Sequence, residues 1–267
     1  MKPRAIVFDL FGDHVRYHGG RARTRALCEL LGVFGVPEAT TRVVLSRMRK
    51  EGWLDTQREG RAVVHALTDK SWQLLDQGRT RIFERARRPW DGQWRMVIYG
   101  VAREDRSGRE RLRRTLSWLG FGPLAAATWI SPHPRLDDVA GALAGIPLRR
   151  LDLLTCRSRS RADDLQMVGR CWDLGGLGRD YSGWARRLGD LPPAAELAAV
   201  SGAAALRLRV ELVEEYRQLP FRDPDLPGEL LPEGWMGRTA HDLFVARHEA
   251  LAAPADAYVR EVLERHR

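Results

Sequence analysis

Val36–Leu67 has the sequence VPEATTRVVLSRMRKEGWLDTQREGRAVVHAL, which predicts an amphipathic helix followed by a small β-hairpin. On a helical wheel that advances about 100° per residue, one narrow face carries Thr41, Val44, Leu45 and Met48. The other residues of the helix lie away from this face: Val43, Ser46 and Lys50 opposite it, and Arg42, Arg47 and Arg49 on the flanks. The apolar face can pack on a helical core while the other side presents cations and a hydroxyl group.

The residues around this helix predict a familiar order of elements. Pro37-Glu38 suits a helix start, and Gly52 suits a helix end. Gly60 lies in the turn of the hairpin, and Thr68 can cap the helix that follows. The further elements expected here are helices over 3–11, 24–34 and 69–87, strands over 54–57 and 62–67, and a turn over 58–61. Helix, helix, helix, hairpin, helix predicts a winged helix-turn-helix domain over residues 1–87.

A helix of this kind can read the major groove of DNA, because arginine and lysine donate to guanine edges or phosphates. The basic tip of the hairpin would then touch a phosphate or enter the minor groove. The predicted DNA-binding residues are Thr40, Arg42, Val43, Ser46, Arg47, Arg49 and Lys50 on the helix, and Arg58 and Arg61 on the wing. The alternative is a solvated basic helix face beside a wing that makes protein contacts.

Strands and helices alternate in the next segment, residues 88–157. The elements expected here are strands over 94–101, 127–131 and 148–155, and helices over 109–119 and 136–144. This order predicts a ferredoxin-like α/β sandwich. Residues 158–267 are expected to form a helical domain, with helices over 177–188, 194–219, 241–251 and 255–265 and a Pro-rich connector between the second and third. The connector is long enough to be a functional loop or a packed cover.

Bulk properties narrow the class of protein. The chain has 267 residues, 44% of them hydrophobic, which suits two or three small domains in an α+β protein. It has no stretch of about 18 apolar residues that would predict a membrane span, and no signal peptide is expected. Three widely spaced cysteines predict neither disulfides nor zinc and fit the cytoplasm. A net charge of +9 favours a polyanionic partner, although an arginine-rich genome also contributes to it.

Patterns that would predict catalysis or a metal are weak. His14 and His18, and His241 and His248, could each share a helix face, but nothing supplies the remaining ligands of a zinc site. Metal-dependent nucleases with a ferredoxin-like fold carry an aspartate at the end of the first strand, where 97–101 has no carboxylate. Ser131-Pro132-His133 lacks a third member for a hydrolase. We therefore expect no catalytic residue, no metal and no cofactor.

Longer motifs give the chain a resemblance to a known family. They are 11–13, 41–54, 67–68, 89–94 (PWDGQW), 119–124 (LGFGPL), 129–133 (WISPH), 223–227 (DPDLP) and 230–235 (LLPEGW). Through these segments nearly the whole chain resembles the PaaX family of bacterial transcriptional repressors, regulators of phenylacetic acid degradation. The resemblance implies a winged helix-turn-helix, a central ferredoxin-like domain similar to a CRISPR adaptation nuclease, and a helical C-terminal domain. It also implies a homodimer that binds a palindromic operator and is released by an aryl-CoA thioester, typically phenylacetyl-CoA.

Coenzyme A carries several phosphate charges, so an acyl-CoA effector requires a basic pocket. The candidate ligand-binding residues are Arg149, Arg150, Arg157, Arg159 and Arg161, with Trp172 and Trp184 as rings that could stack on the adenine or the acyl group. For any single tryptophan, core packing is the alternative role. The expected function is a dimeric DNA-binding repressor. The alternative is a metal-dependent nuclease or a CoA-utilising enzyme that keeps the winged helix as a tether.

Overall fold

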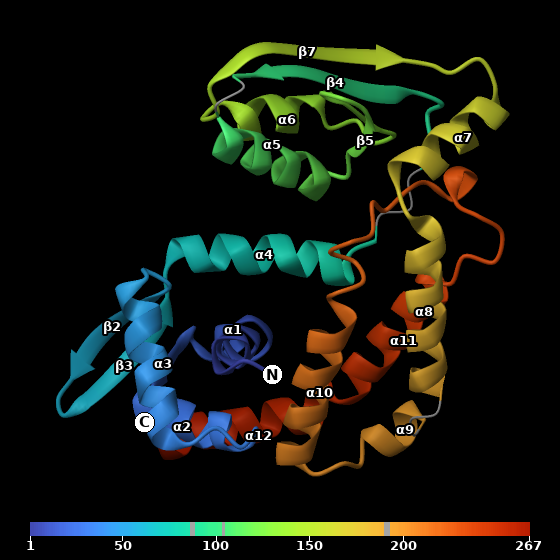
Figure 1. Cartoon of the computed structure of the whole chain (residues 1–267). Helices are drawn as coiled ribbons and strands as arrows, with labels where there is room; N and C mark the ends of the chain where they lie inside the picture. Colours follow the sequence, from blue (N-terminus) through green and yellow to red (C-terminus); the bar gives the residue numbers. More distant parts are fainter. Residues whose placement is uncertain (86–88, 103–104, 190–192) are drawn as a thin grey trace. The chain divides into compact units, whose positions relative to one another are not determined.

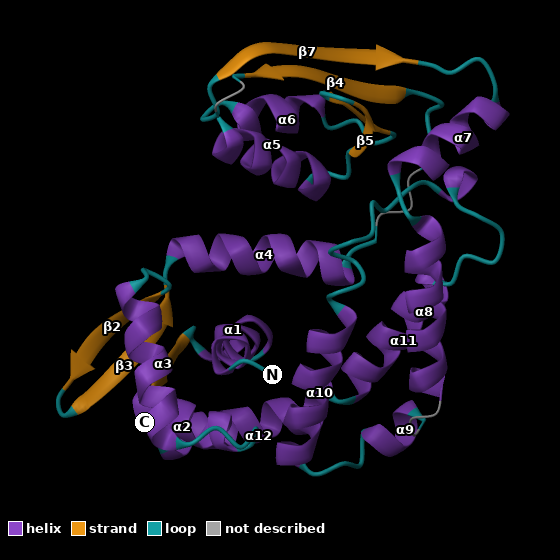
Figure 2. Cartoon of the chain, in the orientation of Figure 1, coloured by secondary structure: helices purple, strands orange, loops and turns teal. Residues whose placement is uncertain are grey.

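The chain contains helices and two antiparallel β-sheets, which confirms the expected α+β class (Figure 2). The structure is a computed structural model that describes residues 1–85, 89–102, 105–189 and 193–267. Internal contacts divide the chain into two units. Unit 1 contains Met1–Glu84, Trp184–Gln218 and Thr239–Arg267, and unit 2 contains Arg85–Gly183 and Leu219–Arg238.

The N-terminal part of unit 1 has the expected order of helices and hairpin (Figure 1). Its elements are α1 (Pro3–Asp13), the 3₁₀ helix η1 (Val15–His18), β1 (Arg21–Arg23), α2 (Thr24–Gly32), α3 (Glu38–Lys50), β2 (Leu54–Glu59), β3 (Ala62–Leu67) and α4 (Asp69–Phe83). The strands form an antiparallel sheet in the order β1-β3-β2. Thr68 caps α4 as predicted, since its hydroxyl accepts a hydrogen bond from Ser71 N.

Two local expectations differ from the structure of this part. The strand β1 was not expected, because Arg-Ala-Arg is too short to show an alternating pattern, and only Ala22 of the three is buried. The helix α4 ends at Phe83 rather than at Arg87, and Glu84 is already non-helical. The last predicted helical residues, 86 and 87, lie outside the described residues.

The C-terminal part of unit 1 is helical. It contains the end of α8 (Leu174–Gly189), then α9 (Ala194–Leu197), α10 (Gly202–Tyr216), most of α11 (Gly237–Ala250) and α12 (Ala252–Arg265). The single helix expected over 194–219 is wrong, because the chain leaves the helix between Leu197 and Gly202. A Cβ atom on Gly202 would lie 2.7 Å from Tyr258 Cβ, so the start of α10 approaches α12 too closely for any larger residue.

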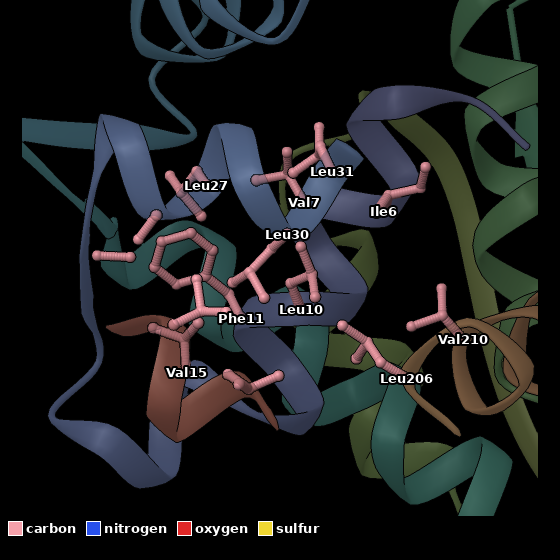
Figure 3. Packing of buried hydrophobic residues seen from close by; sticks show 14 of the residues in the cluster. Ile6, Val7, Leu10, Phe11, Val15, Leu27, Leu30, Leu31, Leu206 and Val210 are labelled. Carbon is pink, nitrogen blue, oxygen red and sulfur yellow. The ribbon is translucent and has the colours of Figure 1, made fainter. Parts of the chain in front are cut away.

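One hydrophobic core joins the two parts of unit 1. It combines residues of α1, α2, α3 and β2 with residues of α10 and α12. In Figure 3, Ile6 and Leu10 of α1 lie among the leucines of α2 and beside Leu206 and Val210 of α10. All four of these side chains are at most 1% exposed. The C-terminal helices therefore complete the core of the N-terminal elements. The division into domains at 1–87, 88–157 and 158–267 stays a prediction.

Unit 2 is built around the second sheet. Its elements in chain order are β4 (Trp94–Val101), α5 (Arg106–Trp118), β5 (Gly122–Ala125), β6 (Thr128–Ser131), α6 (Leu136–Leu143), β7 (Leu148–Cys156) and α7 (Arg161–Cys171). The strands pair antiparallel in the order β5-β6-β4-β7. The strand β5 was not among the expected strands, because Gly122 and Pro123 are typical of a turn. As an edge strand it tolerates a proline, whose missing N–H breaks no ladder between strands.

Helices and a connector cover the two faces of this sheet. Leu112 and Leu116 of α5 and Val139 and Leu143 of α6 pack on one face. On the other face, Trp94 and Ile130 pack against α7 and the short helix η2 (Gly228–Leu230). The helix α7 was not expected. The Pro-rich connector is a packed cover here, because Leu226 and Leu230 are buried in this second cluster. In the part of the chain that the structure describes, no helix is long and apolar enough to cross a membrane.

The shared core predicts that a cavity in α10 destabilises the N-terminal elements. Leu206→Ala should lower the free energy of unfolding by about 2–5 kcal/mol, because it removes a fully buried side chain. It should also accelerate hydrogen exchange of the α3 amides. Leu208→Ala on the same helix is the control, since Leu208 is 37% exposed and should change stability by no more than about 0.5 kcal/mol. Unchanged protection of α3 in the Leu206 variant would show that the N-terminal elements hold together without α10.

Candidate DNA-binding surface

The helix α3 is anchored by the face that the sequence predicts. Thr41, Leu45 and Met48 are at most 1% exposed and belong to the buried side of the helix. The C-terminal end is a Schellman motif: Gly52 N donates to Arg49 O at 3.0 Å and Trp53 N donates to Met48 O at 2.9 Å. Gly52 has φ 72°, a conformation that suits glycine. The helix is thus fixed along its length and at its end.

The opposite side of α3 is open to solvent. Each side chain that the sequence assigned to DNA is exposed: Thr40, Arg42, Val43, Ser46, Arg47, Arg49 and Lys50. Val43 is 67% exposed. A β-branched apolar residue at such a position gains nothing from folding and is available for contact with a thymine methyl group. This face is therefore accessible, and its role in DNA binding remains a prediction.

Two of the arginines on this face form ion pairs within the helix region. Arg42 Nε donates to Glu38 Oε1 at 3.0 Å, and Arg47 Nε donates to Glu51 Oε1 at 2.8 Å. Such exposed pairs contribute only about 0.3–0.5 kcal/mol. A phosphate can replace the carboxylate at little cost. Among the described residues, Arg49 and Lys50 have no ion-pair partner.

The wing is a tight hairpin. Glu59 pairs with Ala62 in the ladder, so Gly60 and Arg61 form a two-residue turn in which Gly60 has φ 60°. Arg58 and Arg61 are both exposed, as the prediction requires. The turn therefore has two residues, 60 and 61, instead of the four expected over 58–61. The side chains of Arg58 and Arg61 both lie at this end of the hairpin.

The junction between α3, the wing and α4 is held by hydrogen bonds from two hydroxyl groups. Thr68 Oγ1 donates to Gly52 O at 3.0 Å, and Ser71 Oγ donates to Trp53 O at 2.7 Å. The Trp53 ring lies between two cations, with Lys70 Nζ 3.8 Å and the Arg4 guanidinium 4.9 Å from its centroid. These contacts fix the direction in which the wing leaves α3.

His65 ties the wing to α2. Its Nε2 lies 2.9 Å from Thr24 Oγ1, across β3 and the start of α2. Burial, and to a smaller degree the positive charge of Arg49, lowers the pKa of His65 to about 4. His65 is therefore neutral at physiological pH. Its buried ring adds no charge to the surface.

A buried ionic network that joins α1, α10 and α11 was not predicted from the sequence. Asp13 of α1 accepts hydrogen bonds from Arg209 Nε of α10 at 2.6 Å and from His248 Nε2 of α11 at 2.9 Å. Burial raises the pKa of Asp13, but His248 and Arg209 outweigh it and hold that pKa far below its usual range. The signal in the sequence was the pair of carboxylates, Asp9 and Asp13, four residues apart in the apolar stretch that follows Arg4.

The histidines considered as metal ligands contact carboxylates or a hydroxyl group. His14 Nδ1 lies 2.9 Å from Asp256 Oδ1 of α12, and His248 contacts Asp13. His241 Nδ1 lies 3.1 Å from the hydroxyl of Tyr216. Within the described ranges, no group of three or more His, Cys, Asp or Glu side chains is arranged to hold a metal ion. The pairs instead fasten α1 to the C-terminal helices.

The candidate effector residues lie in different surroundings. All five candidate arginines are exposed and lie in unit 2: Arg149 and Arg150 on β7, Arg157 and Arg159 after it, and Arg161 at the start of α7. Trp172 is half-buried in unit 2 and stacks on Trp94 with ring centroids 6.4 Å apart. It lies flat on Gly122, where a Cβ atom would come within 2.5 Å of the ring. Trp184 belongs to unit 1, where it is 3% exposed and packs on Tyr216.

The comparison with known proteins bears on the whole chain. The transcriptional repressor PaaX of Escherichia coli K12 is 32% identical to it over 96% of this chain and 83% of that protein. The chain belongs to the PaaX family. Three family models match in succession: "PaaX-like protein" over 2–71, "PaaX protein central Cas2-like domain" over 87–168 and "PaaX-like protein C-terminal domain" over 172–261. The solved structure of the uncharacterized protein Rv0674 from Mycobacterium tuberculosis has a TM-score of 0.62 and 27% identity, covering 93% of this chain and 96% of that one.

Two segments that gave the resemblance to the PaaX family meet in unit 2. Asp223 is buried and accepts hydrogen bonds from the Tyr181 hydroxyl and from Arg85 Nη2, each at 2.7 Å. In the neighbouring segment, His133 Nε2 lies 2.9 Å from Pro224 O. The PaaX-like motifs at 129–133 and 223–227 therefore hold the connector on unit 2. Their role in this structure is packing.

Asp9 supplies a pH test of the buried network. Burial, opposed by Arg217 and reinforced by Glu214 and Asp13, raises the pKa of Asp9 to about 7. The folded state then binds a proton that the unfolded state releases near the ordinary pKa of 3.8. Protonated Asp9 therefore stabilises the folded state below about pH 4, and this stabilisation is lost as the pH rises toward 7. Asp9→Asn keeps the neutral form at every pH.

We expect Asp9→Asn to gain stability over the wild type between pH 4 and pH 8, by a few kcal/mol at most. Urea unfolding at several pH values measures the difference. Asp55→Asn, which removes an exposed carboxylate from β2, is the control. A constant difference between Asp9→Asn and the wild type across this range would contradict a neutral buried Asp9.

Proposed function

We propose that the chain is a transcriptional repressor that binds duplex DNA through α3 and the β2–β3 wing. The observation that carries the proposal is the division of α3 into a fully buried face and an exposed basic face in a PaaX-family chain. The relative with 32% identity is named as a transcriptional repressor. We assign the N-terminal elements to a winged helix-turn-helix, in which α3 enters the major groove and α2 crosses the phosphate backbone.

For unit 2 we propose a ferredoxin-like sandwich, since its β-α-β-β-α-β order and antiparallel sheet order β5-β6-β4-β7 fit that topology. We further propose a cytoplasmic homodimer on a palindromic operator. Two recognition helices one helical turn apart, about 34 Å, would read the two half-sites. An effector that favours another separation would release the protein, because a ligand shifts the population toward the state that it binds more tightly.

The recognition surface is tested with an operator selected by the wild-type protein from a pool of random duplexes. Arg47→Ala or Lys50→Ala should weaken operator binding by about 1–3 kcal/mol and relax the preference for operator over other DNA. Arg61→Ala should weaken binding to all sequences alike, because a wing cation contacts phosphate. Gel shifts on both kinds of duplex measure these changes. Full operator preference in the Arg47 and Lys50 variants would exclude the exposed face of α3 as the reading surface.

The proposed effector is an acyl-CoA, with an aryl group such as phenylacetyl. The exposed arginines around β7 and the start of α7 would bind its phosphates, and Trp172 would pack on a ring; Trp184 would become reachable only if its helices separated. Adding phenylacetyl-CoA to the operator complex should release the DNA, whereas free coenzyme A should not. Arg157→Gln with Arg159→Gln should raise the concentration needed. Operator binding that is unchanged at saturating phenylacetyl-CoA would exclude this effector.

The alternative function is that of an enzyme. It is considered because residues 87–168 match the model of a Cas2-like domain. The proposal of a regulator without catalytic residues is favoured because Gly100 lies near the end of β4, where a nuclease of this fold carries an aspartate. Incubating the protein with duplex DNA and magnesium or manganese tests it. Clean cleavage would favour the nuclease.

A further inference from the structure

The helix α5 of unit 2 carries more arginine than the helix assigned to DNA reading. Its thirteen residues, RSGRERLRRTLSW, contain five arginines and one glutamate, whereas α3 contains four basic residues and one glutamate. Leu112 and Leu116 hold the helix on the sheet, and both are fully buried. The charges therefore gather on the side of α5 that faces away from the core.

The arginines of α5 divide into two groups. Arg109 and Arg111 donate to backbone carbonyls, of Ala102 at 3.4 Å and of Gly145 at 2.9 Å. The others are Arg106, Arg113 and Arg114, and all three are exposed. Among the described residues, the one carboxylate within ion-pair distance of these three is Glu110, 3.8 Å from Arg114, in a pair whose side chains are 72% and 74% exposed. This arginine face is defined as Arg106, Arg113 and Arg114.

The nearby carboxylate at the start of α5 is already engaged. Asp105 Oδ1 accepts a hydrogen bond from Gly108 N at 2.7 Å, which caps the helix. At the other end, Trp118 and Phe221 pack edge to face with ring centroids 5.6 Å apart, and they remain 37% and 40% exposed. The arginine face thus continues into an exposed aromatic pair. Exposed arginines are among the side chains that contact the phosphates of a nucleic acid backbone.

We propose that the arginine face of α5 binds the phosphates of duplex DNA without reading its sequence. This inference rests on the proposed function for its choice of polyanion, since a DNA-binding repressor meets duplex DNA above all. Arg106 and Arg113 are seven residues apart, which is about 10 Å along the helix. Duplex DNA carries one charge per about 1.7 Å of its axis, so several phosphates lie within this span.

The test uses the full chain and a labelled 30-base-pair duplex of mixed sequence, with anisotropy measured over a range of NaCl concentrations. The variant Arg106→Gln/Arg113→Gln/Arg114→Gln removes the arginine face. Each lost phosphate contact flattens the plot of log affinity against log salt by about 0.9, so the slope should fall by about 2 to 3. At 0.1 M NaCl the affinity should drop by at least about tenfold.

A charge-matched control separates a site from net charge. Arg186→Gln/Arg187→Gln/Arg260→Gln removes three exposed arginines from α8 and α12. Its salt slope should stay close to that of the wild type. Equal slopes in the two triple variants, or no change in either, would overturn the proposal. If the α5 triple variant loses its circular dichroism spectrum, Arg113→Gln alone should still flatten the slope by about 1.

Two further readouts complete the test. On the operator selected by the wild type, the α5 variant should lose affinity for operator and mixed-sequence duplex by the same factor, whereas Arg47→Ala should reduce their ratio. The proposal for α5 and the proposal for α3 are therefore tested independently of each other. A single-stranded 30-mer should bind the wild type more weakly than the duplex. Tighter binding of the single strand that is lost in the α5 variant would overturn the duplex assignment.

Discussion

Burial of α1 between the N-terminal helices and the C-terminal helices is the constraint on which unit 1 depends. Leu10 and Phe11 of α1 are fully buried, and the same cluster contains Leu206 of α10 and Val259 of α12. A three-helix winged domain of about 70 residues has a small core of its own. Here α10 and α12 enlarge it. The helix α3 consequently shares a core with residues that are more than 150 positions away in the chain.

Charges inside this core set the geometry of the packing. Arg209 and His248 are 8% and 5% exposed, and both contact Asp13. A buried ion pair adds little net stability, because removing each charge from water costs nearly as much as their attraction returns. Breaking the Arg209–Asp13 pair would leave an unpaired buried charge, which is severely unfavourable. The network therefore penalises every arrangement of α1, α10 and α11 except the one in which all three partners meet.

Local signals in the sequence predicted the elements that bury a periodic face. The faces of α3, the bounds of β3 and β4, and the Thr68 cap are confirmed because each depends on residues within one turn or one strand. The strand β5 was missed although its partner β6 is adjacent, because Gly122 and Pro123 are typical of a turn. The strand β1 depends on a partner far along the chain, since it exists by pairing with β3. The same reason hid the Asp13 network, whose members are separated by 196 and 235 positions.

Access of solvent decides how firmly an arginine of this chain is held by its carboxylate partner. Arg209 is held by Asp13 in a largely buried place, where water competes little with the carboxylate. Arg47 also has a carboxylate partner, Glu51, but its side chain is 80% exposed, so water and salt already compete for it. A phosphate can take the place of Glu51 for a few tenths of a kcal/mol. Pairing along α3 thus keeps the guanidinium groups ordered on the surface while leaving them accessible to another anion.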